Sequence, residues 1–364
     1  MRKGDIANVA IVGFGNVGQA VAAALTNNPE LYPDLRLYAI FTRRPDAVQE
    51  QLVWPMRQMV YENHEIYSLP KKPDVAILCD GATGLLDEGM GAEWATICNT
   101  VCSYDDHGRV PEYFAAMNRV AKKAGHVAAI CTGWHPGTLS VQGLYANTFL
   151  GVTPHHLYGL TPKGGLSMGH TQHVKDVPGV ADGVQYTHTR PEAIERIKTG
   201  DNPTLTSGDK IWREVFIVLK PGAEEEQVKS AITTMEGYFA PYQTQVTIVD
   251  QETLDAIRSE RGMAHDGMTI AVAETSPGRL ATLIYQCEYA RNPEGTARIM
   301  LPCARAACRL NSQIKPGIIG VAASLMAPWH RLSQGYISGA FTMLDLAPAL
   351  LSAHPQEKLL AEFV

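Results

Sequence analysis

Hydrophobic positions in the first third of the chain alternate between short apolar runs and helical spacing. Four apolar runs are typical of short buried strands: residues 8–12, 35–41, 75–79 and 127–131. Apolar residues also recur at helical spacing from Val17 to Leu25, and residues 112–123 form a second helical pattern. Strands that alternate with helices predict an α/β fold built on a parallel, doubly wound sheet.

The pattern changes after Cys131. Residues 133–170 are rich in Gly, Pro and His, which predicts long loops. Three strand-like runs follow, at residues 184–187, 215–219 and 246–249. One helix is expected at residues 224–235. Because strands and helices no longer alternate here, we expect a second domain of the mixed α+β type.

Two domains are predicted from this change, and a chain of 364 residues is long enough for both. The first comprises residues 1–131 and is completed by about 310–364. In that last segment, an apolar helix from 339 to 351 is expected to return to the first domain. The second domain comprises residues 132–309.

The composition excludes several classes of partner. The chain has 31 Lys and Arg against 37 Asp and Glu, a net charge of −6, whereas binders of nucleic acid or anionic membranes carry a basic excess. No stretch approaches the ~20 apolar residues that a membrane helix needs. The N-terminus lacks the pattern of a signal peptide, and the seven cysteines include no C-x-x-C pair. A cytoplasmic protein with reduced thiols is therefore expected.

A glycine motif follows the first predicted strand. Gly13, Gly15 and Gly18 form G-x-G-x-x-G between that strand and an amphipathic helix, with Asn16 and Val17 inside the motif. Gly13 allows a tight turn, Gly15 lets a pyrophosphate approach the backbone, and Gly18 lets the helix pack on the strand. The helix N-terminus favours the phosphate charge. The motif in this position predicts a Rossmann dinucleotide site.

The end of the second strand indicates which cofactor binds. A carboxylate there would hold the ribose hydroxyls of NAD, but the strand ends in Thr42, Arg43 and Arg44. Two guanidinium groups suit the 2′-phosphate of NADP, so NADP is the expected cofactor. Asp80 and Gly81, after the strand at 75–79, complete the predicted cofactor residues.

Two later segments follow predicted strand ends, at residues 103–107 and 132–137. In open α/β sheets, ligands bind outside the carboxyl ends of the strands, so both segments are expected to face the nicotinamide. The first contains Asp105, Asp106 and His107, and the second contains Trp134 and His135. The polar residues of the first segment also fit a capped turn, which is the competing interpretation.

Taken together, these segments resemble meso-diaminopimelate dehydrogenase over most of the length of the chain. The resemblance is carried by the glycine loop, the Arg-Arg end of the second strand and several ordered segments: Tyr104 to His107, Thr132 to Gly137, Gly165 to His170, Pro178 to Val180, Val184 to Thr187, Arg291 to Pro293 and Gly339 to Thr342.

The resemblance implies an NADP-dependent enzyme that oxidatively deaminates the D-centre of meso-2,6-diaminopimelate and reverses the reaction with ammonia. It implies that Asp105 lies by the reacting amine, where it can orient the ammonium or take its proton, and that Trp134 forms an aromatic wall there. It also implies a homodimer built through the second domain.

The resemblance further implies a clamp for the distal, unreactive L-centre. The residues concerned are Thr187, Arg213, His265 and Asn292. An arginine supported by Thr and His donors is chemically suited to a carboxylate. Met168 and Gly169 are assigned to substrate binding on the same basis.

The chain also departs from the family pattern. His135 replaces an Asp near the D-ammonium, and Met168 replaces a Gln. A neutral imidazole can accept a hydrogen bond there, but an imidazolium repels the ammonium. The loop at residues 158–164 is longer than usual and brings Lys163 near the site, and a further insert occupies residues 316–336. A related D-amino acid is therefore an alternative substrate.

Other functions compete with this interpretation. Sugar or inositol oxidoreductases carry Glu-Lys-Pro after a sheet strand, whereas this chain has Asp80 to Thr83 there, with no such Lys. A non-catalytic NADP-binding sensor that lost turnover through His135 is the second alternative. No metal is expected, because no carboxylate or Cys completes a ligand set beside the His pairs 155/156 and 170/173.

Overall fold

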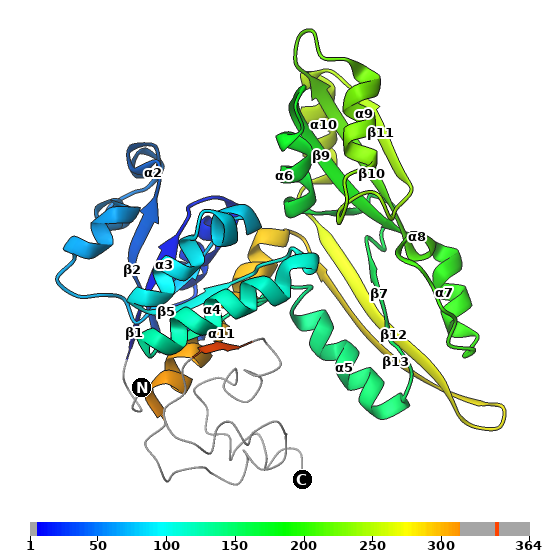
Figure 1. Ribbon diagram of the computed structural model, residues 1–364, viewed down its shortest axis with the longest axis horizontal. Coiled ribbons are helices and arrows are strands. Elements are labelled where there is room, and N and C mark those ends of the chain that lie inside the picture. The colour runs from blue at the N-terminus through cyan, green and yellow to red at the C-terminus, as the bar shows by residue number, and fades with distance from the viewer. Residues whose placement is uncertain (1–5, 314–338, 342–364) are drawn as a thin grey trace. The chain divides into compact units, whose positions relative to one another are not determined.

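A computed structural model describes residues 6–313 and 339–341, and the chain separates into two compact units (Figure 1). Unit 1 contains the residues up to Thr138 and from Pro293 onward, and unit 2 contains Leu139–Asn292. The insert at 316–336 lies outside the described residues.

Unit 1 is built on a seven-stranded sheet in which all pairings are parallel. In spatial order the strands are β14 (Gly339–Phe341), β6 (Val127–Ala129), β5 (Asn99–Cys102), β4 (Val75–Leu78), β1 (Ala7–Val12), β2 (Leu35–Thr42) and β3 (Val60–Glu62). The strand order reverses between β1 and β4, which is where a doubly wound sheet binds its ligand. The predicted α/β fold is confirmed.

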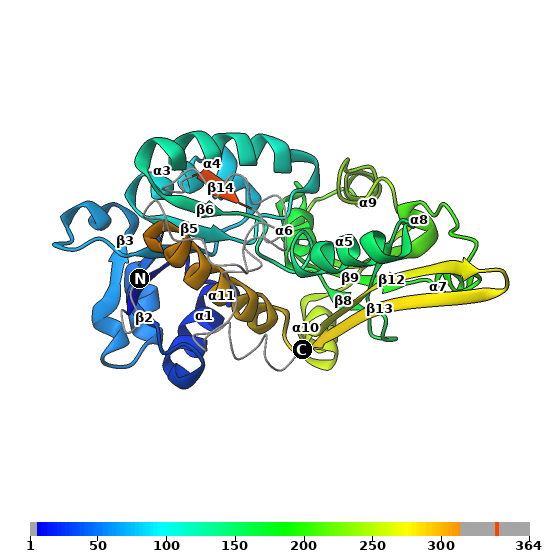
Figure 2. The ribbon, with the colours of Figure 1, turned by 90° about the horizontal axis from the view of Figure 1, so that it is seen from below.

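Helices cover both faces of this sheet, with α3 and α4 on one side and α1 and α11 on the other (Figure 2). The helices of unit 1 are α1 (Asn16–Asn27), α2 (Pro45–Gln51), α3 (Met90–Ile97), α4 (Val110–Ala124) and α11 (Asn292–Gln313). Helix α4 shows why these helices pack against the sheet. It buries Tyr113, Met117 and Ala121, which recur at intervals of four residues and therefore line one stripe of the helix.

Helix α11 belongs to unit 1, although the sequence analysis placed residues up to 309 with the second domain. Its Arg305 is buried, and its Nε donates to both carboxylate oxygens of Asp34, at 2.9 and 2.8 Å. Asp34 lies just before β2, so this buried ion pair ties the helix to the sheet.

The prediction of a helix beginning at Gly339 is wrong for the residues that the structure describes. Gly339–Phe341 form β14, which pairs in parallel with Val127–Ala129 of β6. A short apolar run fits a buried parallel strand as well as a helix, so periodicity alone could not separate the two. The rest of the predicted helix, 342–351, lies outside the described residues.

Unit 2 contains two sheets and is of the mixed α+β type, as predicted. The four-stranded sheet comprises, in order, β11 (Thr244–Ile248), β10 (Ile211–Leu219), β9 (Val180–Thr189) and β8 (Gly165–Leu166). Only β10 and β11 pair in parallel within it. The antiparallel three-stranded sheet comprises β13 (Arg279–Tyr289), β12 (His265–Ser276) and β7 (His155–Tyr158). The helices are α5 (Thr138–Leu150), α6 (Met168–Asp176), α7 (Pro191–Lys198), α8 (Ser207–Lys210), α9 (Glu225–Thr233) and α10 (Gln251–Arg261).

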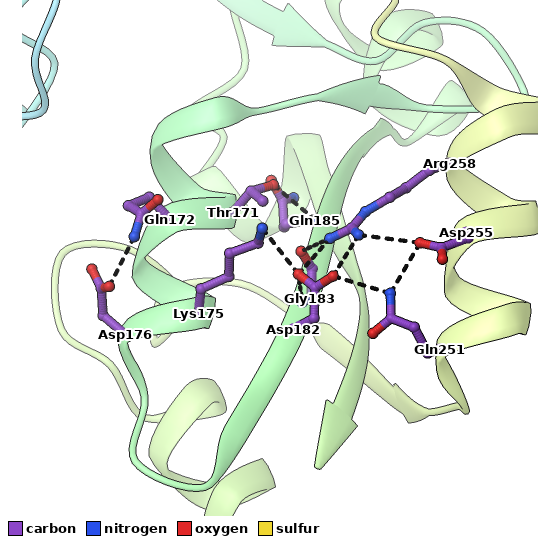
Figure 3. Close-up of polar contacts among 10 residues, drawn as sticks. All are labelled: Thr171, Gln172, Lys175, Asp176, Asp182, Gly183, Gln185, Gln251, Asp255 and Arg258. Carbon is purple, nitrogen blue, oxygen red and sulfur yellow. Dashed lines mark hydrogen bonds and ion pairs between the residues drawn. The ribbon is translucent and has the colours of Figure 1, made fainter. Parts of the chain in front are cut away.

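A polar network centred on Asp182 joins two of these helices to β9 (Figure 3). Arg258 of α10 donates to both carboxylate oxygens of Asp182, at 2.6 and 2.7 Å, and Lys175 of α6 lies 2.9 Å from the same carboxylate. These cations hold the pKa of Asp182 well below its usual range, with the Arg258 hydrogen bond as the largest cause. The network fixes α6 and α10 against the sheet that carries the residues described below.

Candidate active-site residues

The glycine loop adopts the geometry that the sequence motif predicts. Gly13 has a φ of +90°, a left-handed conformation that favours glycine, and a methyl group there would lie 2.8 Å from the carbonyl oxygen of Cys79. At Gly18 a methyl group would lie 2.2 Å from the carbonyl oxygen of Gly13. Gly13 therefore allows the glycine loop to approach the residue that follows β4, and Gly18 allows α1 to approach the loop and β1.

The N-terminus of α1 is suited to an anion. Its N-cap is Gly15, and no side chain caps the helix among the described residues, so its first N–H groups point outward unpaired by a cap. Around Gly15 no atom lies within 4 Å of where a side chain would begin. Asn16 is exposed and Val17 half-buried in the same turn. This cradle of open space and backbone donors fits a pyrophosphate.

The end of β2 presents the two predicted arginines to solvent. Thr42 is buried, and its hydroxyl accepts a hydrogen bond from the Arg44 N–H at 3.2 Å. The Arg43 guanidinium, 67% exposed, lies between two carboxylates, 3.5 Å from Asp80 and 3.6 Å from Glu88. Arg43 therefore already forms ion pairs with Asp80 and Glu88, which the sequence did not indicate.

Asp80 and Gly81 follow β4 at the same sheet edge. The Gly81 N–H donates to Asp80 Oδ1 at 2.8 Å, which fixes the carboxylate. A methyl group at Gly84 would lie 2.9 Å from that carboxylate, so the short helix at Thr83–Asp87 packs directly against it. Asp80 therefore orients Arg43 and lies beside the glycine loop, because β4 is the neighbour of β1.

The loops that follow β5 and β6 lie side by side. The Thr132 N–H and hydroxyl both donate to the carbonyl oxygen of Cys102, at 3.0 and 2.9 Å. A methyl group at Gly133 would lie 3.1 Å from Ser103 Cβ, so glycine allows this close approach. The structure therefore brings together the two segments that the sequence analysis singled out.

Asp105 lies on the first of these loops, directly after the buried ring of Tyr104, which stacks on Tyr113 at 4.2 Å between centroids. Asp105 is an exposed residue. Desolvation by the surrounding protein and, to a smaller extent, the charge of the neighbouring Asp106 together raise the pKa of its carboxyl group to about 6. A carboxyl group with that pKa can accept a proton and release it near neutral pH.

On the second loop, Trp134 is buried and His135 is half-buried. The imidazole of His135 lies against that of His107, with 4.9 Å between the ring centroids. His107 was part of the predicted segment, but sequence spacing did not indicate this ring pair. Asp105, Trp134 and His135 thus lie on adjacent loops of unit 1.

Unit 2 carries a separate set of polar residues on the four-stranded sheet. Arg213 of β10 faces Thr187 of β9 across the antiparallel ladder, and Arg213 Nη1 donates to the Thr187 hydroxyl at 3.3 Å. Both side chains are buried, with 4% and 3% exposure. Two of the predicted clamp residues are therefore direct neighbours.

The guanidinium of Arg213 is buried without a carboxylate partner among the described residues. Its carbon lies 4.0 Å from the ring centroid of Tyr242, and its Nε is buried with no hydrogen-bond partner. Burial lowers the pKa of Arg213, because desolvation disfavours the charged form. A buried charge that lacks a counter-ion is costly, so this position favours an anionic ligand. No pattern in the sequence indicated that Tyr242 would lie against Arg213.

His265 lies against the same part of the sheet. A methyl group at Gly165, the β8 residue that pairs with Thr187, would lie 2.2 Å from His265 Nδ1. Burial and, to a smaller extent, the charge of Arg213 together lower the pKa of His265 to about 3. His265 is therefore neutral at physiological pH and presents a hydrogen-bonding imidazole beside Arg213.

The remaining predicted residues of unit 2 flank this cluster. Asn292 Nδ2 donates to the carbonyl oxygen of Leu166, at 3.0 Å, and so fastens the segment just before α6, the helix that begins with Met168 and Gly169. Gly169 is half-buried in the first turn of α6. Met168, also half-buried, packs against a cluster that includes Tyr186 and Leu254, so part of its surface serves the core.

Three other features bear on function. Among residues 6–313 and 339–341, no group of three or more His, Cys, Asp or Glu side chains could hold a metal ion. Within the same described residues, no helix is both long and apolar enough to cross a membrane. Cys79, Cys98, Cys102, Cys131, Cys303 and Cys308 are thiols that form no disulfide within this part of the chain.

A doubly wound sheet with a glycine loop, in a chain whose mixed second unit buries a guanidinium with no carboxylate partner among the described residues, is typical of the class of two-domain dinucleotide-dependent α/β enzymes. Comparison with known proteins narrows the class. Residues 133–290 match the family described as "Diaminopimelic acid dehydrogenase C-terminal domain". The chain is 34% identical over 98% of both sequences to the meso-diaminopimelate D-dehydrogenase of Lysinibacillus sphaericus. It belongs to the meso-diaminopimelate dehydrogenase family.

Solved structures agree. The Corynebacterium glutamicum diaminopimelate dehydrogenase in complex with diaminopimelate is 32% identical, covers 99% of this chain and all of its own, and superposes with a TM-score of 0.81. An engineered D-amino acid dehydrogenase bound to NADP+ is 31% identical, with a TM-score of 0.79 and the same coverage.

Proposed function

We propose that the protein is an NADP-dependent dehydrogenase that oxidatively deaminates the D-centre of meso-2,6-diaminopimelate, or of a related D-amino acid. The products are the 2-oxo acid and ammonia, and the reaction runs in reverse as a reductive amination. Family membership and the relatives that bind NADP+ and diaminopimelate support this activity.

The residues of unit 1 fit NADP. The uncapped N-terminus of α1 and the open space at Gly15 suit the pyrophosphate, and Arg43 and Arg44 suit the 2′-phosphate. When bound, NADP supplies the hydride acceptor, and NADPH supplies the donor in reverse. We therefore assign unit 1 to dinucleotide binding and unit 2 to substrate binding and dimerisation.

The chain's own residues handle the proton at nitrogen. A substrate ammonium must lose a proton before hydride can leave the α-carbon, because the nitrogen lone pair stabilises the resulting iminium. Asp105 accepts this proton, and its pKa of about 6 keeps it ionised at neutral pH. Water then adds to the iminium carbon and ammonia leaves. Trp134, a buried aromatic side chain, limits the access of bulk water.

One observation carries the substrate class: the buried guanidinium of Arg213 has no counter-ion among the described residues. A diamino-dicarboxylate has two amino acid ends. Asp105 suits the reacting ammonium, and the Arg213–Thr187 pair suits the distal carboxylate. A monocarboxylate would leave Arg213 unpaired, so the dicarboxylate is the preferred substrate.

We also propose a cytoplasmic homodimer. The apolar surface of unit 2 supports the dimer. Cysteines that form no disulfide support the cytoplasmic location. The edge strand β13 exposes Leu280, Leu283 and Ile284, and an exposed apolar edge strand of this length requires cover. Helix α5 exposes three further large apolar side chains: Leu144, Tyr145 and Phe149.

The test is a screen of NADP reduction with meso-diaminopimelate and a panel of D- and L-amino acids. We expect the highest kcat/KM with meso-diaminopimelate, lower values with D-amino acids and none with L-amino acids. NADP binding without reduction by any amino acid would instead identify a non-catalytic NADP-binding protein.

A further inference from the structure

Gln185 is a fully buried polar residue in the middle of β9, and the activity proposed above leaves it without a role. Its side chain is 0% exposed, although glutamine is usually found at the surface. It shares a strand face with Thr187, two residues further along, because side chains alternate along a strand. Its cross-strand partner is Val215, next to the Arg213–Thr187 pair in the same ladder.

The side chain of Gln185 acts directly on Thr187. Gln185 Nε2 donates to the Thr187 hydroxyl oxygen at 3.0 Å, and Arg213 Nη1 donates to the same oxygen at 3.3 Å. A hydroxyl oxygen that accepts two hydrogen bonds has its own proton left to donate. Because Gln185 and Arg213 both donate to this oxygen, the Thr187 hydroxyl proton is directed away from both of them and can be donated to a ligand.

The backbone of Gln185 holds the other substrate-binding segment. Its N–H donates to the Thr171 hydroxyl at 3.0 Å, a bond drawn in Figure 3, and its carbonyl oxygen accepts the Ser167 N–H at 3.4 Å. Ser167 and Thr171 flank Met168 and Gly169. A single residue therefore joins the first turn of α6 to the Thr187–Arg213 pair.

We propose that Gln185 is a positioning residue for the distal carboxylate of the substrate, acting through Thr187 and the start of α6. This inference rests on the proposed function. It predicts that Gln185 affects dicarboxylic substrates selectively, because only they place a carboxylate beside Arg213.

The experiment is a double-mutant cycle between Gln185→Met and Thr187→Val in the full-length enzyme. Methionine keeps the length of the side chain without its amide, and valine keeps the shape of threonine without its hydroxyl. KM and kcat are measured with meso-diaminopimelate and with D-alanine, which has no second carboxylate. Gln245→Met, at an exposed position of β11 in the same sheet, is the matched control.

We expect Gln185→Met to raise KM for meso-diaminopimelate about ten-fold, the usual worth of one buried hydrogen bond, with kcat and the D-alanine parameters within about two-fold of the parent. In the Thr187→Val background, Gln185→Met should have no further effect. Equal losses with both substrates, or losses that multiply in the double variant, overturn the proposal.

A second variant covers the case in which Gln185→Met does not fold. Gln185→Glu preserves the shape but places a carboxylate next to Arg213 and removes the donor to Thr187. With this variant, the rate should no longer saturate with meso-diaminopimelate, whereas KM and kcat for D-alanine should stay close to those of the parent. A KM for meso-diaminopimelate equal to that of the parent overturns the proposal. A parent enzyme without turnover of meso-diaminopimelate refutes the proposed function and the inference together, whereas an active parent with unselective variants refutes only the inference.

Discussion

The imidazole rings of His107 and His135 lie 4.9 Å apart between centroids, with their planes tilted by 36°. They project from the loops after β5 and β6, which also carry Asp105 and Trp134. Protonating both rings would place two like charges in contact near Asp105, where the proposed reaction places the substrate ammonium. The pair therefore makes the proposed reacting side of this chain sensitive to charge. The resemblance described above implies an Asp in the family pattern where this chain has His135.

His135→Asp restores that carboxylate. A second negative charge near the reacting ammonium should favour meso-diaminopimelate, which carries two ammonium groups where D-alanine carries one, so we expect its kcat/KM to rise relative to that of D-alanine. The variant should also lose less activity below pH 7, because the His107–His135 repulsion disappears. His107→Asn, which removes the neighbouring imidazole without adding charge, is the control. Loss of all turnover in His135→Asp with NADP binding intact would instead make His135 a required catalytic group.

Asp105→Asn keeps the shape of the side chain and removes its charge. We expect kcat to fall by about 10²-fold or more, the usual worth of a placed acid or base. In the parent, kcat/KM should fall as the pH decreases through about 6, where Asp105 becomes protonated, and this acidic limb should be absent from the variant. Steady-state kinetics from pH 5 to 9 would measure both. Near-parental kcat in Asp105→Asn argues against its role at the amine.

The same carboxyl group affects stability with a defined sign. The pKa of Asp105 is raised from 3.8 in the unfolded chain to about 6 in the folded protein. Above pH 6 the carboxyl group is ionised in both states and its charge destabilises the folded state, whereas below pH 3.8 it is neutral in both states and has no such effect. Asp105→Asn should therefore raise the Tm at pH 7 and leave it nearly unchanged near pH 4. Thermal unfolding at the two pH values measures this difference.

Local patterns predicted the first unit well. The turn at Gly13, the helix at Asn16–Asn27 and the strand at Leu35–Thr42 follow from spacing over a few residues, so the sequence carries them directly. The strands β12 and β13 were missed, although Pro277 and Gly278 mark the turn between them. Their side chains do not alternate strictly between polar and apolar residues, because β12 is largely buried whereas β13 is largely exposed.

The site residues were predicted by resemblance more than by spacing. Thr187 and Arg213 are 26 residues apart, and only the antiparallel register of β9 and β10 makes them neighbours. The roles of Tyr242, stacked on Arg213, and of Glu88, beside Arg43, depend on the same long-range packing. No local pattern could indicate them.

Arg213→Met tests the distal clamp. Loss of charge-assisted hydrogen bonds to a carboxylate should raise KM for meso-diaminopimelate by about 10- to 100-fold and leave D-alanine nearly unaffected. Removing a buried charge without a counter-ion should also raise the Tm of the unliganded enzyme. Arg213→Lys keeps a charge but not the planar fork, and should recover only part of the affinity. Equal losses with both substrates would assign Arg213 to the reacting carboxylate or to structure.

Ile284→Lys tests the homodimer. Ile284 is 51% exposed on the edge strand β13, and a charge there would oppose burial against a second copy. Light scattering after size exclusion should give a dimer for the parent and a monomer for the variant at micromolar concentration. Gln245→Lys, exposed on β11, should remain dimeric. A monomeric parent contradicts the proposal.

The choice of cofactor depends on how the charge of Arg43 is shared. Its guanidinium lies 3.5 Å from Asp80 and 3.6 Å from Glu88, so a 2′-phosphate must compete with two carboxylates. The double variant Arg43→Ala and Arg44→Ala should raise KM for NADP by about 10- to 100-fold and change KM for NAD far less. Lys123→Ala is the control for a lost positive charge, because the C-terminus of α4 precedes β6 and so lies at the opposite edge of the sheet.

Glu88→Gln should act in the opposite direction. It removes one competing carboxylate from Arg43 while Asp80, which the Gly81 N–H holds in place, continues to orient the guanidinium. KM for NADP should therefore fall, by about two- to five-fold for a solvent-exposed charge pair, and KM for NAD should not. The effect should shrink at high salt, because exposed charges are screened. Equal catalytic efficiency of the parent with NADP and NAD, or a Glu88→Gln variant with unchanged cofactor preference at low salt, contradicts this account of the site.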